Sequence, residues 1–387
     1  MSSLIERHQL NAQRPTWADI DLNNLAANFH TVKERVGPDV KVMAVVKANA
    51  YGHGAVQCAR RLVKEGAEWF GVALPEEAIE LRAAGIGQPI LSLGGFWQGQ
   101  AAACIQQRIT PVVYRLDMMA AMNQAARDAG VTVDVHVKID TGMGRLGIRF
   151  DQLSEFVMAL KEFENVRIDG LMTHFAAADD DMCRPLTRDQ IRRFDEAAAL
   201  FCERGYRPTH LHLANSAAIY GHREAWGNMV RPGGVLYGLW RDVLPVSVSN
   251  SGLVPVMSVH SRISLLKWVP SGETIGYGCT FEASRNTLIA TIPLGYHDGY
   301  MRGLSNRSNV IVRGAYAPVI GRVSMDLTLV DVTNIPDVAL NDHVTLLGVQ
   351  RKDSEAAVTA EDLARIAGTL SYEVTCGIGA RVPRIYV

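Results

Sequence analysis

The sequence predicts an α/β protein: an eight-fold β/α barrel of the TIM type, followed by a mainly antiparallel β domain. From about residue 40 to residue 240, short apolar runs alternate with helical segments, whereas short strands with Gly, Asn and Pro turns dominate after about Trp240. Alternating strands and helices form parallel sheets with right-handed crossovers. Eight such units in about 200 residues favour a closed barrel, although periodicity alone leaves a doubly wound sheet open.

The predicted barrel strands are short β-rich runs bounded by turn residues. In order they are KVMAVV (41–46), WFGVAL (69–74), PILSL (89–93), TPVVY (110–114), VTVDVHVKI (131–139), VRIDGLMTH (166–174), HLHLA (210–214) and NMVRP (228–232). Predicted helices follow these strands at 55–65, 75–85, 99–107, 116–129, 150–162, 187–203 and near Ser216.

The predicted β domain begins after Trp240. Its strands lie in VMSVHSRISLLKWV (256–269), TLIATIP (287–293), NVIVRG (309–314), YAPVIGRV (316–323), LTLVDV (327–332) and HVTLLGV (343–349). We expect only one clear helix among them, at 360–367. TWADIDL (16–22) alternates like a strand and is expected to join this domain. The domain boundaries that we expect are 1–245 and 246–387.

Composition excludes several classes of partner. The formal net charge of −1 suggests neither a nucleic-acid partner nor an acidic membrane surface. No segment approaches the roughly 20 apolar residues of a membrane span, and the polar start has no apolar region typical of a secretory signal. The six cysteines lack CxxC or metal-type spacing, so we expect free thiols in a reducing cytoplasm. No metal site is expected, because the histidines lack a convincing ligand set and His210 and His212 are expected on opposite faces of their strand.

Lys47 is the first candidate for chemistry. It directly follows an apolar strand, in VVKANAYGHG. Residues just past strand ends line the active-site mouth of a parallel barrel. Partial burial there lowers the pKa of a lysine and favours the neutral amine, which is nucleophilic and can form a Schiff base. From position alone, a lysine that extends to solvent at the barrel rim is the alternative.

Nine motifs extend the argument along the chain. They are AVVKANAYGHG (44–54), KIDTGMGRLGI (138–148), MTHFAAAD (172–179), HLANSA (212–217), RPGGVLYG (231–238), IGYGCTF (275–281), PLGYHDGY (293–300), GRVSMD (321–326) and SYEVTCGIGARVPR (371–384). From Trp17 to the C-terminus the chain resembles the alanine racemase family, within the barrel-type (fold type III) pyridoxal 5′-phosphate enzymes. The nine motifs occur in the same order as in the family, which makes the resemblance specific. A single motif would not suffice, because AVKAN-like strings also occur in related decarboxylases.

The resemblance implies a racemase that interconverts L-alanine and D-alanine with two acid/base groups. Lys47 would carry the cofactor and act on one face of the substrate Cα. Tyr277, in IGYGCTF, would act on the other face and would come from the second subunit of a homodimer with shared active sites. Because the reference pKa of tyrosine is near 10, cationic neighbours would have to help it ionise. Outside this motif, Tyr277 would be interpreted as a tyrosine packed at a sheet turn.

Three basic residues have implied roles around the cofactor ring. Arg231 would donate to the pyridine nitrogen, and because a guanidinium keeps its proton, the ring would stay a weak electron sink. Related decarboxylases have a carboxylate there; outside the motif, Arg231 would pair with a surface acid. Arg145 would bind the phenolic oxygen and the substrate carboxylate. Lys138 would be carbamylated and fix Arg145, unless it forms an ordinary ion pair with Asp140 or Asp134.

Further residues would complete the site. The phosphate would be bound by Ser216, Gly233, Gly234, Tyr51 and Tyr372. His174 would lie near the cofactor ring, and the backbone N–H of Met325 would bind the substrate carboxylate from the partner subunit. Asn215 would be a supporting residue of the site, and Tyr296 would narrow the entrance together with Tyr372. Two positions depart from the family pattern: Gly234 replaces a bulkier apolar residue, and Ser324 stands where Cys is frequent.

Three alternatives stay open. The first is a racemase with a broader or different substrate range, such as serine or lysine. The second is a barrel-type amino-acid decarboxylase, against which Arg231 and Tyr277 argue. The third is a non-catalytic, cofactor-carrying protein of the single-barrel type, which the β domain disfavours. For the racemase, the resemblance implies a cytoplasmic enzyme that supplies D-alanine for peptidoglycan in cell-wall biosynthesis.

Overall fold

The computed structural model describes residues 14–248, 251–350 and 356–387. These residues form two compact units. The first, here the barrel unit, contains residues 25–50 and 55–253. The second, here the β unit, contains the described residues before 25, residues 51–54 and residues 254–387. The short segment 51–54, which follows Lys47, therefore belongs to the β unit.

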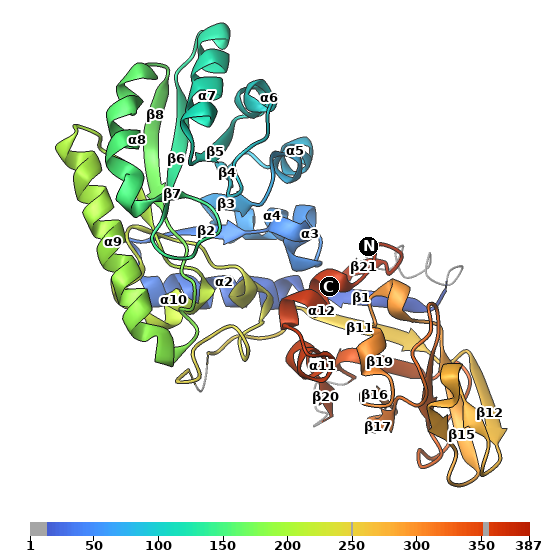
Figure 1. Ribbon diagram of the computed structural model, residues 1–387. Helices are drawn as coiled ribbons and strands as arrows, with labels where there is room; N and C mark the ends of the chain where they lie inside the picture. Colours follow the sequence, from blue (N-terminus) through green and yellow to red (C-terminus); the bar gives the residue numbers. More distant parts are fainter. Residues whose placement is uncertain (1–13, 249–250, 351–355) are drawn as a thin grey trace. The chain divides into compact units, whose positions relative to one another are not determined.

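Eight parallel strands form the centre of the barrel unit (Figure 1). In sheet order they are β10 (Met229–Val230), β2 (Lys41–Val45), β3 (Trp69–Val72), β4 (Ile90–Ser92), β5 (Ile109–Val113), β6 (Val133–Asp140), β8 (Val166–Met172) and β9 (His210–His212). Backbone hydrogen bonds from Asn228 to Leu211 (3.1 Å) and from Arg231 to Ala214 (3.0 Å) connect β9 with β10. The predicted barrel is confirmed, and a doubly wound sheet is wrong. A short strand, β7 (Ile148–Arg149), pairs with β6.

Helices cover the outside of these strands (Figure 1). They are α2 (Leu22–Val36), α4 (Ala55–Lys64), α5 (Pro75–Ala83), α6 (Ala101–Gln106), α7 (Leu116–Ala129), α8 (Leu153–Ala159), α9 (Arg184–Glu203) and α10 (Ser216–Gly221). The segment labelled α3 (Lys47–Tyr51) is a turn with left-handed backbone angles after β2. Helix α7 buries Met118, Met122 and Ala126, which lie four residues apart on one helix face. It ends at Gly130, whose φ of 67° suits a left-handed C-cap. Within the described residues, no helix has both the length and the apolarity that crossing a lipid bilayer requires.

A layer of large apolar side chains fills part of the barrel interior. Its members are Met43, Trp69, Leu91, Val112, Met172 and Met229. Six different strands contribute one residue each to this cluster, and a barrel interior filled by side chains is typical of TIM barrels. The interior is therefore a packed core, and chemistry has to take place at an end of the barrel.

The β unit contains a large, mainly antiparallel sheet. Its order is β17 (Ala315–Pro318), β16 (Asn309–Val312), β19 (His343–Val349), β11 (Met257–Arg262), β1 (Thr16–Ile20) and β21 (Arg384–Tyr386), and β20 (Ala357–Val358) also pairs with β19. The prediction that TWADIDL joins this unit is confirmed, because β1 pairs with β11 from Thr16↔Ser261 to Ile20↔Met257. Smaller sheets contain β12 (Leu265–Val269), β15 (Thr287–Ile292) and β18 (Thr328–Asp331), and β13 (Thr274–Ile275) with β14 (Phe281–Glu282).

The β unit also contains two helices, α11 (Ala360–Ala367) and α12 (Ser371–Gly377). The first has the predicted bounds, but the expectation of only one clear helix was wrong. Helix α12 is short, and its β-branched Val374 and Thr375 have low helix propensity, so its local signal is weak. Burial of these two side chains stabilises the helix instead.

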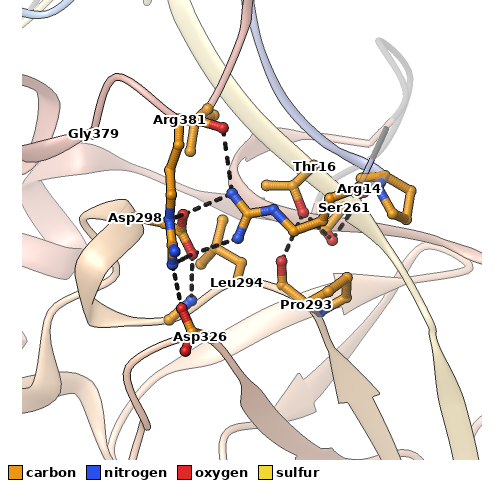
Figure 2. Close-up of polar contacts among 12 residues, drawn as sticks. Arg14, Thr16, Ser261, Pro293, Leu294, Asp298, Asp326, Gly379 and Arg381 are labelled. Carbon is orange, nitrogen blue, oxygen red and sulfur yellow. Dashed lines mark hydrogen bonds and ion pairs between the residues drawn. The ribbon is translucent and has the colours of Figure 1, made fainter. Parts of the chain in front are cut away.

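A buried carboxylate in the β unit binds two arginines (Figure 2). Asp298 accepts hydrogen bonds from Arg14 at 2.7 and 2.8 Å, and from Arg381 at 2.7 and 3.2 Å. It also accepts the backbone N–H of Gly295 at 3.0 Å. Arg381 makes a further contact of 2.5 Å with Asp326. These contacts fix the start of β1, the turn around Asp298 and the segment before β21 to one another.

We expect Asp298→Asn to lower the free energy of unfolding by about 2–4 kcal/mol at neutral pH, because two guanidinium groups lose a buried counter-charge. Chemical denaturation of the variant and of the wild type measures this difference. The matched control is Asp326→Asn, since Asp326 is exposed and forms a surface ion pair with Arg381, and we expect it to cost less than about 1 kcal/mol. Equal, small effects of the two substitutions would contradict the assignment of Asp298 as the central group.

The same carboxylate predicts a pH dependence. Burial raises the pKa of Asp298, but hydrogen bonds from Arg14 and Arg381 outweigh burial and lower the pKa to about 2. A carboxylate with a lowered folded-state pKa stabilises the fold above its unfolded pKa of about 4. The difference in unfolding free energy between wild type and Asp298→Asn should therefore have its full size above about pH 4 and should become smaller as the pH falls through about 2. Chemical denaturation of both proteins at several pH values measures this change.

Candidate active site

Lys47 lies at the C-terminal end of β2, where barrel active sites are built. The four residues after it, 48–51, adopt left-handed backbone angles, with φ between 52° and 54°. None of them is glycine, and each non-glycine residue in this conformation costs about 1–2 kcal/mol. Such strain persists only where the surroundings impose it, and it is concentrated at functional sites. The turn therefore marks Lys47 as a residue whose placement the fold controls.

Two side chains hold this left-handed turn. Glu77, in the first turn of α5, accepts the N–H of Ala48 through Oε1 and the N–H of Ala73 through Oε2, each at 2.6 Å. Asn49 accepts the N–H of Ala55 at 2.8 Å. Glu77 therefore links the peptide directly after Lys47 to the end of β3, which fixes the backbone that carries the lysine. The sequence motifs did not single out Glu77.

Positive charge gathers at this end of the barrel. Lys138 on β6 is only 5% exposed, and burial, followed by the charges of Arg231, Arg145 and Lys47, lowers its pKa to about 7. Burial and the same cationic groups hold the pKa of His174, which follows β8, well below its ordinary value. Residues from several strands thus form one electropositive region, which suits an anionic ligand such as a phosphate or a carboxylate.

Arg231 is buried at the end of β10, with only 4% exposure. Nη1 donates to the carbonyl of His212 at 2.6 Å and lies 3.1 Å from its Nδ1. Nη2 donates to the carbonyls of Thr173 (2.7 Å) and Leu213 (3.0 Å) and lies 3.3 Å from His174 Nδ1. Among the described residues, no carboxylate is bonded to this guanidinium. The alternative of an arginine paired with a surface acid is therefore wrong.

The predicted phosphate-binding residues of the barrel unit also come together. Asn215 caps α10 by accepting the N–H of Ala218 at 3.0 Å, and Ser216 is the first residue of that helix. The N–H of Gly233 donates to Ser216 Oγ at 2.9 Å, and Gly234 follows directly in a short 3₁₀ turn. This corner lies after β9 and β10, which are the seventh and eighth strands of the barrel in chain order. TIM barrels bind phosphate at this place.

Tyr51 and Tyr372 meet within the β unit. Their ring centroids are 5.2 Å apart, and the rings are inclined by 60°. Close packing of the segment 51–54 against α12 explains a glycine there, because a Cβ on Gly52 would overlap the carbonyl of Thr375. The structure therefore brings together two residues that are more than 300 positions apart in the sequence.

The remaining predicted residues of the β unit are exposed. Tyr277 is 72% exposed on the turn between β13 and β14, so it is not packed into the sheet. Met325 is 53% exposed, and the loop that carries it lies beside Tyr296, because the N–H of Tyr296 donates to Ser324 at 2.9 Å and the N–H of His297 donates to Met325 at 3.1 Å.

Two expectations about the barrel interior need correction. His210 and His212 do not point to opposite faces: residues two apart in a strand share a face, and both rings are buried near His136, at centroid distances of 5.7 and 4.9 Å. Lys138 does not pair with Asp134 or Asp140. Asp134 pairs with Arg167 at 2.6 Å, while Asp140 accepts backbone N–H groups of residues 142–144.

The six cysteines form no disulfide in the described residues, which contain all of them, as expected. In the part of the chain that the structure describes, no three His, Cys, Asp or Glu side chains are grouped so that they could hold a metal ion. The groups gathered at the barrel end are therefore amines, guanidiniums, imidazoles, hydroxyls and backbone N–H donors.

A TIM barrel with a lysine after its first strand, an electropositive end and an added β unit defines the class of barrel-type pyridoxal-phosphate enzymes. The family model "Alanine racemase, N-terminal domain" matches residues 20–240, and the model "Alanine racemase, C-terminal domain" matches residues 256–386. The chain belongs to the alanine racemase family.

Individual relatives agree with this membership over the whole chain. The alanine racemase of Geobacter sulfurreducens is 43% identical over 378 residues, which cover 97% of each protein. The crystal structure of alanine racemase from D-cycloserine-producing Streptomyces lavendulae has a TM-score of 0.89 at 36% identity and 97% coverage of both chains. Alanine racemase from Bartonella henselae with covalently bound pyridoxal phosphate has a TM-score of 0.86 at 28% identity, covering 97% of this chain and 100% of that one.

Proposed function

We propose that the chain is a pyridoxal-5′-phosphate-dependent racemase that interconverts L-alanine and D-alanine, and that the D-alanine serves peptidoglycan synthesis. One observation carries the proposal most directly: Lys47, Lys138, Arg145 and Arg231 gather at one end of a barrel that belongs to this family. Arg231 is bonded to carbonyls and imidazoles in place of a carboxylate. This donor set separates the proposal from a decarboxylase, which has a carboxylate at this position.

The residues at the barrel end fit pyridoxal phosphate. Ser216, Gly233 and Gly234 would hold the phosphate, with Tyr51 and Tyr372 as further predicted ligands. Arg145 would bind the phenolic oxygen, Arg231 would donate to the ring nitrogen, His174 would lie near the ring, and Lys47 would carry the cofactor covalently. When bound, the cofactor withdraws electrons from the substrate Cα and makes its proton acidic. Arg231 keeps its own proton, which limits that withdrawal and disfavours side reactions such as transamination.

The chain's own groups would move the proton. Lys47 Nζ would exchange a proton with one face of the substrate Cα, and its strained, Glu77-anchored turn supports a fixed position for that nitrogen. Oη of Tyr277 of the partner subunit would exchange a proton on the opposite face. Arg145 and the backbone N–H of Met325 of the partner subunit would orient the substrate carboxylate. A planar carbon flanked by two such groups can be protonated from either side, which is racemisation.

Two structural details support the other predicted features. The lowered pKa of Lys138, to about 7, populates the neutral amine, which is the form that reacts with carbon dioxide. The carbamate would place a negative charge beside Arg145 in place of a buried cation. The exposure of Tyr277 and Met325 on the β unit supports a homodimer in which these side chains serve the second subunit.

An isotope experiment tests the reaction and the substrate together. The purified protein, loaded with pyridoxal phosphate, is incubated in deuterated water with L-alanine, L-serine or L-lysine. We expect Cα deuterium in both enantiomers of alanine, and a kcat/KM for serine and lysine that is lower by at least about tenfold. Carbon dioxide release from L-lysine would identify a decarboxylase instead. Bound cofactor without Cα–H exchange would identify a non-catalytic carrier, and equal rates would indicate a broad-range racemase.

A further inference from the structure

Two buried histidines connect Arg231 to a carboxylate through the barrel interior. Arg231 Nη1 lies 3.1 Å from Nδ1 of His212, on β9. Nε2 of the same ring lies 2.8 Å from Nδ1 of His136, on β6. Nε2 of His136 in turn lies 3.8 Å from Oδ2 of Asp169, on β8. Three strands thus contribute a continuous row of polar groups that ends at the guanidinium of the candidate site.

Only one arrangement of protons satisfies the two hydrogen bonds in this row, from Arg231 to His212 and between His212 and His136. A guanidinium can only donate, so Nδ1 of His212 has to accept and its single proton sits on Nε2. That proton is donated to Nδ1 of His136, whose own proton therefore sits on Nε2. Nε2 lies 3.8 Å from Oδ2 of Asp169, which is an ion-pair distance and is too long for a hydrogen bond. Burial lowers the pKa of both rings, which keeps them neutral. Asp169 is ionised, because the contact with His136 is the main factor that lowers its pKa, to about 2.

The backbone makes room for His136 at this point. Gly170 lies opposite it in the β6–β8 register, which shifts between Val135 and His136. A Cβ on Gly170 would lie only 2.5 Å from Nδ1 of the ring. Trp69 packs against the ring from another strand, with centroids 5.5 Å apart. A glycine, a register irregularity and an aromatic neighbour together confine one ring, so its orientation is controlled by the fold.

The contacts of Arg231 determine which of its donors is left for a ligand. Both Nη atoms are occupied by acceptors of the barrel: the imidazole and carbonyl of His212, two further carbonyls and the ring of His174. Among the residues that the structure describes, Nε–H has no hydrogen-bond acceptor. If His212 carried its proton on Nδ1 instead, that N–H would face the N–H of Nη1, and repulsion would displace the guanidinium.

We propose that His136 and Asp169 are positioning residues that fix the proton and the orientation of His212, and through it hold Arg231 in place for the cofactor's ring nitrogen. The inference rests on the proposed function, because Arg231 affects the reaction only if it faces the cofactor. Neither residue touches the substrate or the cofactor in this scheme. Both act through the row, at the end farthest from Arg231.

The test compares two histidines that share two neighbours, Asp169 and Trp69, but differ in their hydrogen bonding to His212. His136 and His210 both lie near Asp169 (3.8 and 3.6 Å) and pack on Trp69 (5.5 and 5.1 Å), but only His136 is hydrogen-bonded to His212. Holoenzymes of the wild type, His136→Phe and the matched control His210→Phe are labelled with ¹⁵N-histidine. In the wild type and in His210→Phe, the NMR shifts should show His212 protonated on Nε2 alone. In His136→Phe, we expect a mixture of the two His212 tautomers.

Steady-state kinetics give the second readout. We expect His136→Phe to lower kcat about tenfold with a smaller change in KM, and His210→Phe to change kcat less than about twofold. Asp169→Asn keeps the side-chain shape, so it tests the charge if His136→Phe folds poorly; it should shift the tautomers in the same direction, and Asp169→Glu should restore them partly.

Unchanged His212 tautomers in both His136→Phe and Asp169→Asn would overturn the proposal, as would equal effects of His136→Phe and His210→Phe. The NMR readout is independent of racemisation. A wild-type holoenzyme without racemase activity, but with the His212 proton on Nε2 alone and with the expected shifts in the variants, would therefore refute the proposed function and leave the positioning row intact.

Discussion

Lys47→Ala is expected to lower kcat for alanine racemisation by about 10⁴-fold or more in both directions. The side chain would have two roles at once, as the covalent attachment point of the cofactor and as the acid/base group on one face of Cα. Removal of the amine eliminates both roles, and the strained turn that Glu77 holds fixes the backbone from which this amine extends. Chiral chromatography of alanine started from each enantiomer measures the loss.

The same strand offers a matched control. Lys41 begins β2 and Lys47 follows its end, so the two lysines lie at opposite ends of one element. We expect Lys41→Ala to change kcat less than about twofold, since barrel chemistry takes place at the C-terminal ends of the strands. The absorption of the lysine-bound cofactor should persist in Lys41→Ala and disappear in Lys47→Ala. Wild-type rates and spectrum in Lys47→Ala would refute the assignment.

The barrel could be predicted because its strands are buried on both faces. Such strands appear in a sequence as short apolar runs, and the helices between them carry an independent amphipathic signal. Helices α7 and α11 have the predicted bounds, 116–129 and 360–367. Both end at a glycine in the left-handed conformation, a stop signal that is visible in the sequence.

The left-handed turn after Lys47 could not be predicted from local sequence. Ala48, Asn49 and Ala50 all have right-handed preferences, and tertiary contacts override them. Glu77 supplies the main contact, and its only local signal is its place in the first turn of a helix, where a carboxylate is common. Many helices have a carboxylate in their first turn that interacts only with the helix itself. The sequence does not show whether such a carboxylate also accepts a hydrogen bond from a distant peptide, as Glu77 does.

In the candidate site, too, some residues could be proposed from local motifs, whereas others depend on tertiary contacts. Lys47, Arg145 and Arg231 could be proposed from the sequence because each lies in a motif that resembles the family's, and their roles stay predictions. The row from Asp169 to Arg231 was missed, although a correct reading of strand alternation places His210 and His212 on one face. Even then, the approach of His136 depends on the register between β6 and β8, and a register irregularity is not visible in the sequence.

Tyr277→Phe is expected to lower kcat for racemisation by about 10³-fold in both directions, because one face of Cα loses its acid/base group. The phenyl ring keeps the shape of the side chain and removes only the hydroxyl. Lys47 is intact, so exchange of the Cα proton with deuterium should persist for the single enantiomer whose proton faces Lys47, and should be faster than racemisation. Equal loss of exchange from both enantiomers would contradict a two-base arrangement.

A mixture of the two inactive variants tests whether subunits share their sites. In a hybrid dimer of Lys47→Ala and Tyr277→Phe, one site would combine an intact Lys47 with an intact Tyr277 of the partner subunit, and the other site would lack both. Random exchange makes half of the dimers hybrid, so activity should recover to about a quarter of the wild-type value. Mass spectrometry of differently tagged subunits verifies the exchange. If hybrids form and activity does not return, Tyr277 does not act on the active site of the second subunit, because the intact combination would then be present without effect.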